Sequence, residues 1–118
     1  MVGIELFRRD KNTLAFNAGE TIFAEGDAGD RMYVIVEGEV NLMVHGLLLE
    51  SLGPGGVFGE MALLGHEPRT ATVSAHTDCK LAPIDARRFL FLVQETPYFA
   101  LQMMRVMSDR LRRMDLRI

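Results

Sequence analysis

The stretch "MYVIVEGEVNLMVHGLLLESL", residues 32–52, decides the fold class of this chain. It contains three short runs rich in apolar residues, at 32–36, 39–44 and 47–52. Such runs are typical of β-strands when turn residues separate them. Gly38 and Gly46 stand in the two gaps, and glycine accepts the positive φ that a tight hairpin turn requires. The stretch therefore predicts two consecutive β-hairpins.

Further strands are expected on both sides of this stretch. The apolar runs place them at residues 14–16, 20–24, 69–76 and 79–85. Segments rich in Gly, Asp and Pro, at 24–30 and 53–56, interrupt the runs and predict loops. Many short strands at this spacing favour a mainly β protein, with a jelly-roll barrel over about residues 12–85.

The periodicity becomes helical after Asp85. This residue suits the N-cap of a first helix beginning at Ala86, because its carboxylate can accept a hydrogen bond from an unpaired amide. Thr96 followed by Pro97 predicts the start of a second, long helix near residue 97. The expected architecture is a barrel with a short flanking N-terminal helix and C-terminal helices over about residues 86–118.

The terminal helix carries an apolar stripe at alternating spacings of four and three. Its members are Ala100, Met104, Met107, Leu111, Met114 and Ile118. This is the heptad seam of two helices wrapped around each other, which favours a homodimer, while packing of the stripe on the barrel is the alternative. Arginines on the same helix are expected to solvate its outer face, with a docking surface for an acidic partner as the alternative: Arg105, Arg110, Arg112, Arg113 and Arg117.

Length and composition indicate one folded domain over residues 1–118. The chain has 48% hydrophobic and 25% charged residues, which is ordinary for a globular protein. Its net charge of -3 argues against a general binder of nucleic acid or of anionic membranes, because such proteins carry a basic surplus. The N-terminus lacks the pattern of a signal peptide, and no apolar run reaches the length of a membrane span. We therefore expect a cytoplasmic protein.

The residues that commonly bind metals are few and scattered. Cys79 is the single cysteine, so neither an intramolecular disulfide nor a cysteine-rich metal site can form. His45, His66 and His76 lack the clustered spacing of a metal-binding barrel. We expect no metal and no resident cofactor, and we find no arrangement of nucleophile and base that predicts an enzyme.

Residues 58–73, "FGEMALLGHEPRTATV", indicate a binding site for an anion. Gly59 permits a sharp turn or a close approach of the backbone, and residues 60–64 favour a short helix whose first amides are unpaired. Arg69, expected at the start of a strand, has a planar guanidinium suited to two phosphate oxygens. A carboxylate beside a bound phosphate would repel it. Glu60 nevertheless fits the site if it accepts hydrogen bonds from hydroxyls next to the phosphate, such as those of ribose. The pattern therefore predicts a sugar phosphate as the ligand.

The same residues resemble the phosphate-binding cassette of the cyclic nucleotide-binding domain family, whose pattern is Phe-Gly-Glu, a short variable loop, then Arg, a small residue and Ala. Residues 19–40 are similar to the family's hairpin region, so the resemblance to this catabolite-activator-like barrel covers the chain from about residue 5. It implies that Glu60 binds the ribose 2′-hydroxyl and that Arg69 pairs with the cyclic phosphate. It also implies further contacts from the remaining cassette residues, which are Gly59, Met61, Ala62, Leu63, Thr70 and Ala71.

The resemblance places other ligand contacts outside the cassette. Leu42 and Leu49 fall where family members line the base and sugar with apolar side chains. Met114 lies where a residue of the C-terminal helix, which acts as a lid in the family, could reach the purine. Thr70 resembles the version associated with cGMP, but family members with Thr there also respond to cAMP. We expect cAMP to be favoured over cGMP.

The expected function is that of a regulatory sensor that binds a cyclic nucleotide and repositions its C-terminal helix. No helix-turn-helix pattern follows the terminal helix within the 118 residues, so we expect no direct DNA binding and an unknown output partner. The alternative is a degenerate barrel that keeps the cassette's shape, binds nothing, and serves as a dimerisation or docking module. Haem sensing through a histidine is a further alternative, but it would make Glu60 and Arg69 needless.

Overall fold

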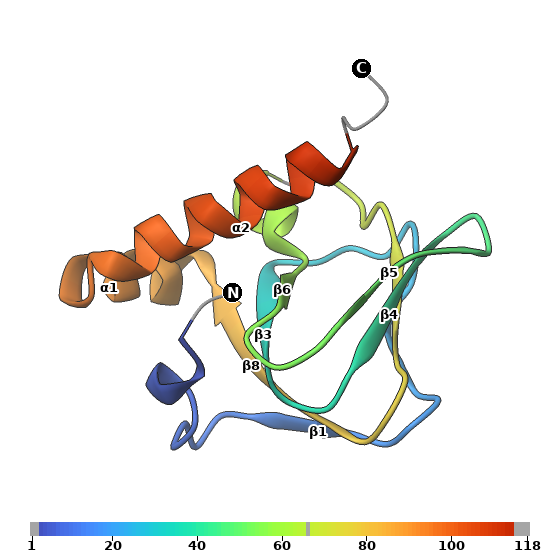
Figure 1. Ribbon diagram of the computed structural model, residues 1–118, viewed down its shortest axis with the longest axis horizontal. Coiled ribbons are helices and arrows are strands. Elements are labelled where there is room, and N and C mark those ends of the chain that lie inside the picture. Colours follow the sequence, from blue (N-terminus) through green and yellow to red (C-terminus); the bar gives the residue numbers. More distant parts are fainter. Residues whose placement is uncertain (1–2, 66, 115–118) are drawn as a thin grey trace.

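Two four-stranded antiparallel sheets form the body of the protein, and two helices follow them (Figure 1). The computed structural model describes residues 3–65 and 67–114, except for the side chain of Met114. The strands are β1 (Leu14–Phe16), β2 (Thr21–Phe23), β3 (Arg31–Glu37), β4 (Val40–Val44), β5 (Leu47–Leu52), β6 (Val57–Phe58), β7 (Thr72–Ala75) and β8 (Cys79–Asp85). The helices are η1 (Ile4–Leu6), η2 (Glu60–Leu63), α1 (Ala86–Glu95) and α2 (Tyr98–Met114), of which η1 and η2 are 3-10 helices.

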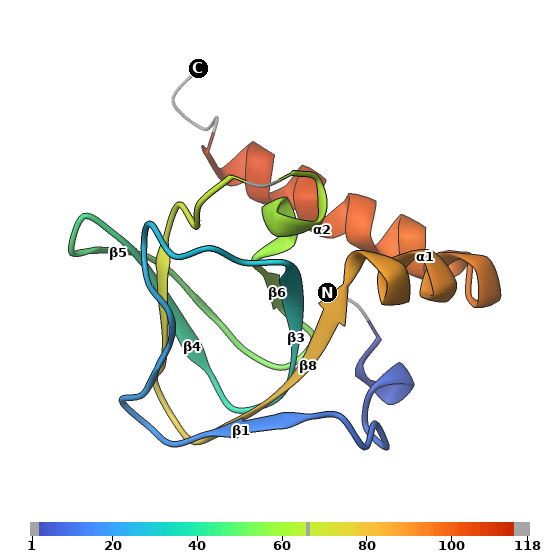
Figure 2. The ribbon, with the colours of Figure 1, turned by 180° about the vertical axis from the view of Figure 1, so that it is seen from behind.

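The strand orders are β1-β8-β3-β6 in one sheet and β2-β7-β4-β5 in the other. Apart from the β4–β5 pair, neighbouring strands in each sheet are not consecutive in sequence, which is the arrangement of a jelly roll and confirms the predicted mainly β fold. Seen from behind, the two sheets face each other and α1 and α2 lie along one side of the barrel (Figure 2). Within the described residues, no helix is both long enough and apolar enough to cross a membrane.

Strand β3 is buried on both faces, which explains its continuous apolar run. Tyr33 and Ile35 point into the core between the two sheets. Met32 and Val34 point the other way, into a second core beneath the helices. Since successive residues of a strand face opposite sides, the sheet of β3 forms the middle layer between the second sheet and the helices.

One of the two predicted hairpins is wrong. His45 and Gly46 both have positive φ, 52° and 78°, and they join β4 to β5 in a two-residue hairpin as expected. Gly38 also has a positive φ, 88°, but β3 and β4 belong to different sheets. The glycine there turns the chain from one sheet to the other, because β3 pairs instead with β6 and β8.

The predicted strand over residues 69–76 is too long at its start. Strand β7 begins only at Thr72, so Arg69 lies in the loop before it and not at the start of a strand. The backbone of Arg69 is paired with another loop, since its amide donates to the Asp27 carbonyl and its carbonyl accepts from the Gly26 amide. Strand β6 was not predicted, because two residues after a Gly-rich loop carry no periodicity.

Both C-terminal helices begin where the sequence predicts. Asp85 caps α1 by accepting a hydrogen bond from the Arg88 amide at 2.8 Å. Helix α2 starts at Tyr98, directly after Pro97. A single face of α2 packs on the barrel, through Phe99, Met103 and Val106.

The predicted heptad seam of α2 is only partly correct. Met104 and Leu111 are exposed, but Met107 packs against the core and Ala100 is half-buried. Exposed apolar side chains instead follow the heptad spacing at Leu101, Met104 and Leu111. Phe99, Met103 and Val106 form the buried face of the helix, and Met107 lies at the edge of that face. The side chain of Met114 and the whole of Ile118 lie outside the described residues.

Replacement of Phe99 by alanine tests the attachment of α2 to the barrel. The ring is fully buried and meets Phe7 and Phe89 edge to face. Its removal leaves a cavity, so we expect Phe99→Ala to lower the free energy of unfolding by about 3–5 kcal/mol in urea denaturation. The control is Leu90→Ala on the exposed face of α1, which we expect to cost less than about 1 kcal/mol. Equal losses in both variants would contradict this packing.

Candidate functional site

The cassette begins with a left-handed turn at Gly59. Its φ of 78° lies in the region that favours glycine, and it forms the N-cap of η2. A Cβ on Gly59 would lie 2.7 Å from Nη1 of Arg69, so a side chain there would collide with the guanidinium. Glycine therefore satisfies two requirements, since it forms the turn and lets the backbone approach Arg69.

Arg69 is the one charged residue among the buried positions of the described chain, with 9% of its surface exposed. Its Nη1 donates to the Gly59 carbonyl at 3.1 Å, and its Nη2 donates to the Arg31 carbonyl at 2.7 Å. The guanidinium carbon lies 4.0 Å from the centre of the Phe23 ring. The group is thus fixed by three elements: β2 supplies the ring, β3 supplies one carbonyl, and the turn before η2 supplies the other.

No carboxylate within the described ranges compensates the charge of Arg69. None lies within ion-pair distance, although Asp27 and Asp30 are near enough to act weakly through space. Burial lowers the pKa of Arg69, because removal from water disfavours the charged form. Arginine nevertheless stays protonated at neutral pH. The fold therefore holds a desolvated cation whose Nε is buried without a hydrogen-bond partner, which is the environment of an anion-binding group.

Glu60 does not point into open solvent but is paired with the C-terminal helix. Its Oε1 accepts a hydrogen bond from Nη1 of Arg110 at 2.6 Å, and both side chains are largely buried. Nη2 of Arg110 also donates to the Val57 carbonyl at 2.7 Å. Helix α2 is therefore attached to both ends of the turn that forms the cassette, and Figure 1 shows η2 lying beside it.

Sequence reasoning missed this role of Arg110. It was expected on the outer, solvated face of α2, but it lies on the same stripe as the buried Met103 and Val106. The spacings of three and four between these residues place them on one helical face, and this is the signal that could have found it. Because arginine is charged, a search for an apolar stripe does not include it among the buried positions.

A second carboxylate meets the same helix. Glu50 on β5 accepts a hydrogen bond from Nη2 of Arg113 and lies 3.7 Å from Nε of Arg110. Arg110 thus contacts Glu60 on one side and Glu50 on the other. The three residues form a chain of alternating charge beneath the end of α2.

The structure brings together some of the other predicted site residues and leaves others apart. Ala62 and Leu63 lie in η2, where they are half-buried, while Met61 in the same helix is exposed. Thr70 is exposed and Ala71 is half-buried, both directly after Arg69. Outside the cassette, Leu42 packs against the core between the sheets, Leu49 is 63% exposed, and Met114 ends α2 with its side chain outside the described part.

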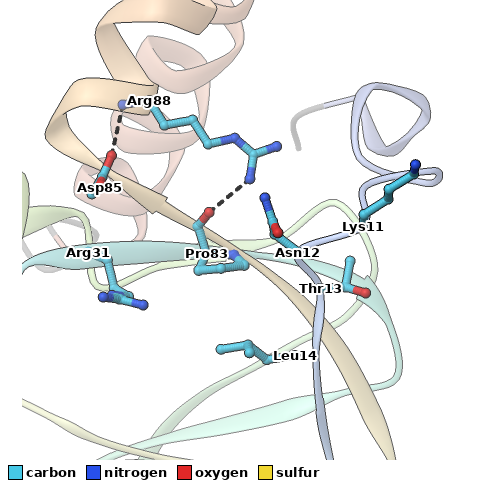
Figure 3. A pocket seen from close by; sticks show the side chains of 8 residues that line it. All are labelled: Lys11, Asn12, Thr13, Leu14, Arg31, Pro83, Asp85 and Arg88. Carbon is cyan, nitrogen blue, oxygen red and sulfur yellow. Dashed lines mark hydrogen bonds between the residues drawn. The ribbon is translucent and has the colours of Figure 1, made fainter.

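A separate cavity of about 510 Å³ lies on the N-terminal side of the molecule (Figure 3). It contains none of the predicted site residues, and its lining consists of Lys11, Asn12, Thr13, Leu14, Arg31, Pro83, Asp85 and Arg88. Two of its cations are already paired, Arg31 with Asp30 and Arg88 with Asp10. It therefore lacks the buried, uncompensated charge that distinguishes Arg69.

The described residues contain no group of three or more His, Cys, Asp or Glu side chains placed to hold a metal ion. Cys79 is buried, and its Sγ lies 3.1 Å from each of the backbone carbonyls of Glu39 and Thr77, either of which can accept its single S–H. Burial raises the pKa of this thiol, which opposes formation of a reactive thiolate. The groups that the site offers are thus suited to binding a ligand by charge and hydrogen bonds.

Comparison with known proteins identifies the class to which this site belongs. The family model of the cyclic nucleotide-binding domain matches residues 13–96. This range includes the strands β1 to β8 and the whole cassette. The chain therefore belongs to the cyclic nucleotide-binding domain family.

Particular relatives support this assignment. The chain is 33% identical over 103 residues to the CRP-like cAMP-activated global transcriptional regulator of Mycobacterium tuberculosis, covering 83% of this chain and 46% of the relative. It is 32% identical to the catabolite activator protein of Thermus thermophilus, with a TM-score of 0.80, covering 97% of this chain and 56% of that one. The chain spans about half the length of these two relatives.

A third relative matches over nearly its whole length. This structure comes from work on a cyclic-GMP-dependent signalling pathway that regulates bacterial phytopathogenesis. It is 30% identical to the present chain, with a TM-score of 0.78, and the match covers 94% of each chain. The fold of residues 3–114 therefore also occurs in a chain of similar length.

Replacement of Arg110 by methionine tests the link between α2 and the cassette. The change keeps an unbranched apolar side chain but removes the guanidinium, so the largely buried Glu60 carboxylate is left without its cation. We expect Arg110→Met to lower the free energy of unfolding by about 1–2 kcal/mol at neutral pH, measured by urea denaturation. The control is Arg112→Met, whose exposed pairing with Asp109 should contribute less than about 0.5 kcal/mol. A larger loss in the control would contradict the proposed link.

Proposed function

We propose that this chain binds a cyclic nucleotide and acts as a regulatory sensor module. The observation that carries the proposal is the buried guanidinium of Arg69, which has no carboxylate partner in the described residues. A bound phosphate would supply the missing negative charge. Membership of the cyclic nucleotide-binding domain family supports this ligand class, as does a relative described as cAMP-activated.

Binding follows from the charges and donors of the cassette. The cyclic phosphate pairs with Arg69 and with the first amides of η2, which have no partner within that helix. The ribose 2′-hydroxyl donates to Glu60. Since Arg110 occupies Oε1 of Glu60, the second carboxylate oxygen is the acceptor for that hydroxyl. Thr70 and Ala71 stay predicted contacts beside the phosphate.

The response to the ligand passes through α2. A nucleotide that adds a hydrogen bond and a neighbouring charge at Glu60 changes the strength of the Glu60–Arg110 pair, and so favours one position of the helix over another. The ligand shifts the helix only by as much as its affinity differs between the two positions.

Several finer expectations stay predictions. A preference for cAMP over cGMP, a cytoplasmic location, the absence of catalysis and the absence of any cofactor besides the ligand all come from the sequence and its family resemblance. The output partner is unknown. Direct DNA binding is not expected from these 118 residues.

A degenerate docking module is the second candidate function. The Glu60–Arg110 pair is the observation in its favour, because a carboxylate already engaged by the protein is less available to a ribose. Under this alternative, the cassette serves to attach α2 to the barrel. The two functions differ in a direct measurement of binding.

Isothermal titration calorimetry with cAMP and with cGMP tests the proposed function. We expect the parent to bind, and we expect Arg69→Ala to weaken binding by about 2–4 kcal/mol, or about one to three decades, because a charge-assisted pair is lost. The control is Lys80→Ala, an exposed cation on β8 outside the cassette. An affinity of Arg69→Ala within twofold of the parent would remove Arg69 from the site, and flat traces for the parent with both nucleotides would favour the docking module.

The exposed seam of α2 leads us to propose a homodimer through this helix. Leu101, Met104 and Leu111 leave apolar surface on the side opposite the barrel. We expect sedimentation equilibrium to show a dimer for the parent and a shift toward monomer for Leu101→Glu. The control is Leu90→Glu, at an exposed leucine on α1 that lies off the seam. A monomeric parent would contradict the dimer.

A further inference from the structure

Glu50 faces the interior of the barrel, although it is charged. It lies directly opposite Leu42 in the antiparallel pairing of β4 and β5, so the two side chains project from the same face of the sheet. Leu42 packs against the core between the sheets, and the Glu50 side chain is 22% exposed. The neighbouring Leu49 has no partner in the register, which shifts between Leu42 and Met43, and it is exposed.

The polar groups around Glu50 are not fully satisfied. Its Oε1 accepts from Arg113, but its Oε2 lies 3.7 Å from Nε of Arg110, which is too long for a hydrogen bond. Nε of Arg110 is buried without a hydrogen-bond partner in the described chain. A donor and an acceptor therefore lie close together without a hydrogen bond between them, so a third polar group beside them can bond to both.

The position of Glu50 relative to Glu60 suggests what that third group is. Arg110 contacts both carboxylates, so they lie on either side of a single side chain. If Glu60 binds the ribose, Glu50 is within reach of the base, because only the side chain of Arg110 separates the two carboxylates. We infer that Glu50 reads the base of the bound cyclic nucleotide and that it favours guanine. This inference rests on the proposed function.

The chemistry of the two bases separates them at a carboxylate. An ionised carboxylate only accepts hydrogen bonds, and its two oxygens together offer about four lone-pair positions. Guanine presents two adjacent donors on its Watson–Crick edge, N1–H and the 2-amino group, and its O6 accepts next to them. The two donors meet the two oxygens of Glu50, and O6 faces the cationic side of Arg110.

Adenine fits the same group less well. Its edge offers one donor, the 6-amino group, next to the lone pair of N1, and that lone pair repels the second carboxylate oxygen. Glu50 therefore opposes the preference for cAMP that the sequence suggested. Glutamine at position 50 would instead favour adenine, because its amide offers one donor and one acceptor and pairs well with that base.

Calorimetric titration of three probes tests this inference: cGMP, cAMP and cyclic inosine monophosphate, which differs from cGMP only by lacking the 2-amino group. We expect the parent to bind cGMP at least about tenfold more tightly than cAMP, with the inosine probe weaker than cGMP, since a bidentate pair discriminates by about this factor. Glu50→Gln should lower the cGMP to cAMP affinity ratio by about tenfold. Glu37→Gln, an exposed carboxylate at the end of β3, should leave the ratio unchanged.

The outcomes separate this inference from the proposed function. If cyclic nucleotides bind and Arg69→Ala weakens binding as expected, but Glu50→Gln leaves the ratio unchanged, the proposed function stands and the role of Glu50 is overturned. A parent that favours cAMP, or that binds the inosine probe as tightly as cGMP, also overturns that role. Both of these measurements use the parent protein, so they do not depend on whether a variant folds. If no cyclic nucleotide binds the parent, both fall.

Discussion

The buried guanidinium of Arg69 is the constraint on which the cassette depends. Removing a cation from water costs free energy. For Arg69 this cost is offset by two backbone carbonyls and an aromatic ring, and not by a carboxylate. To supply those partners, the turn at Gly59, the start of β3 and the ring of Phe23 have to meet at one point. The loop before β7 is held in the same place, because the Arg69 backbone pairs with residues 26 and 27. The protein's own contacts therefore fix the position of the Arg69 guanidinium.

Helix α2 is held to the barrel in two physically different ways. Its first half is attached by apolar packing around Phe99, which no small ligand replaces. Its second half is attached by ion pairs from Arg110 and Arg113 to Glu60 and Glu50. Ion pairs of this kind change strength when a neighbouring charge or hydrogen bond is added. The proposed ligand, bound at the cassette beside Glu60, therefore acts on the second half of the helix.

Local features of the sequence predicted the strands and the helix boundaries well. The Asp85 cap and Pro97 located both helices because capping and proline act over a few residues. A turn at Gly38 was predicted correctly, but the hairpin predicted there was wrong. A positive φ does not reveal whether the strand after a turn pairs with the strand before it or belongs to another sheet. The heptad seam was displaced for a similar reason. Several apolar stripes fit one helix, and the packing of Phe99 against Phe7 and Phe89 selects which one is buried.

The sequence by itself determined the fold class and predicted a cassette with Glu60 and Arg69, because strand patterns, caps and a compact motif depend on residues that are neighbours in the chain. The family model then confirmed the class over residues 13–96. Only the tertiary structure decided that Arg69 is desolvated without a carboxylate, that Arg110 joins α2 to Glu60, and that Glu50 faces inward beside Leu42. These facts depend on contacts between residues 8 to 63 positions apart, and no local periodicity encodes which charged side chains will meet.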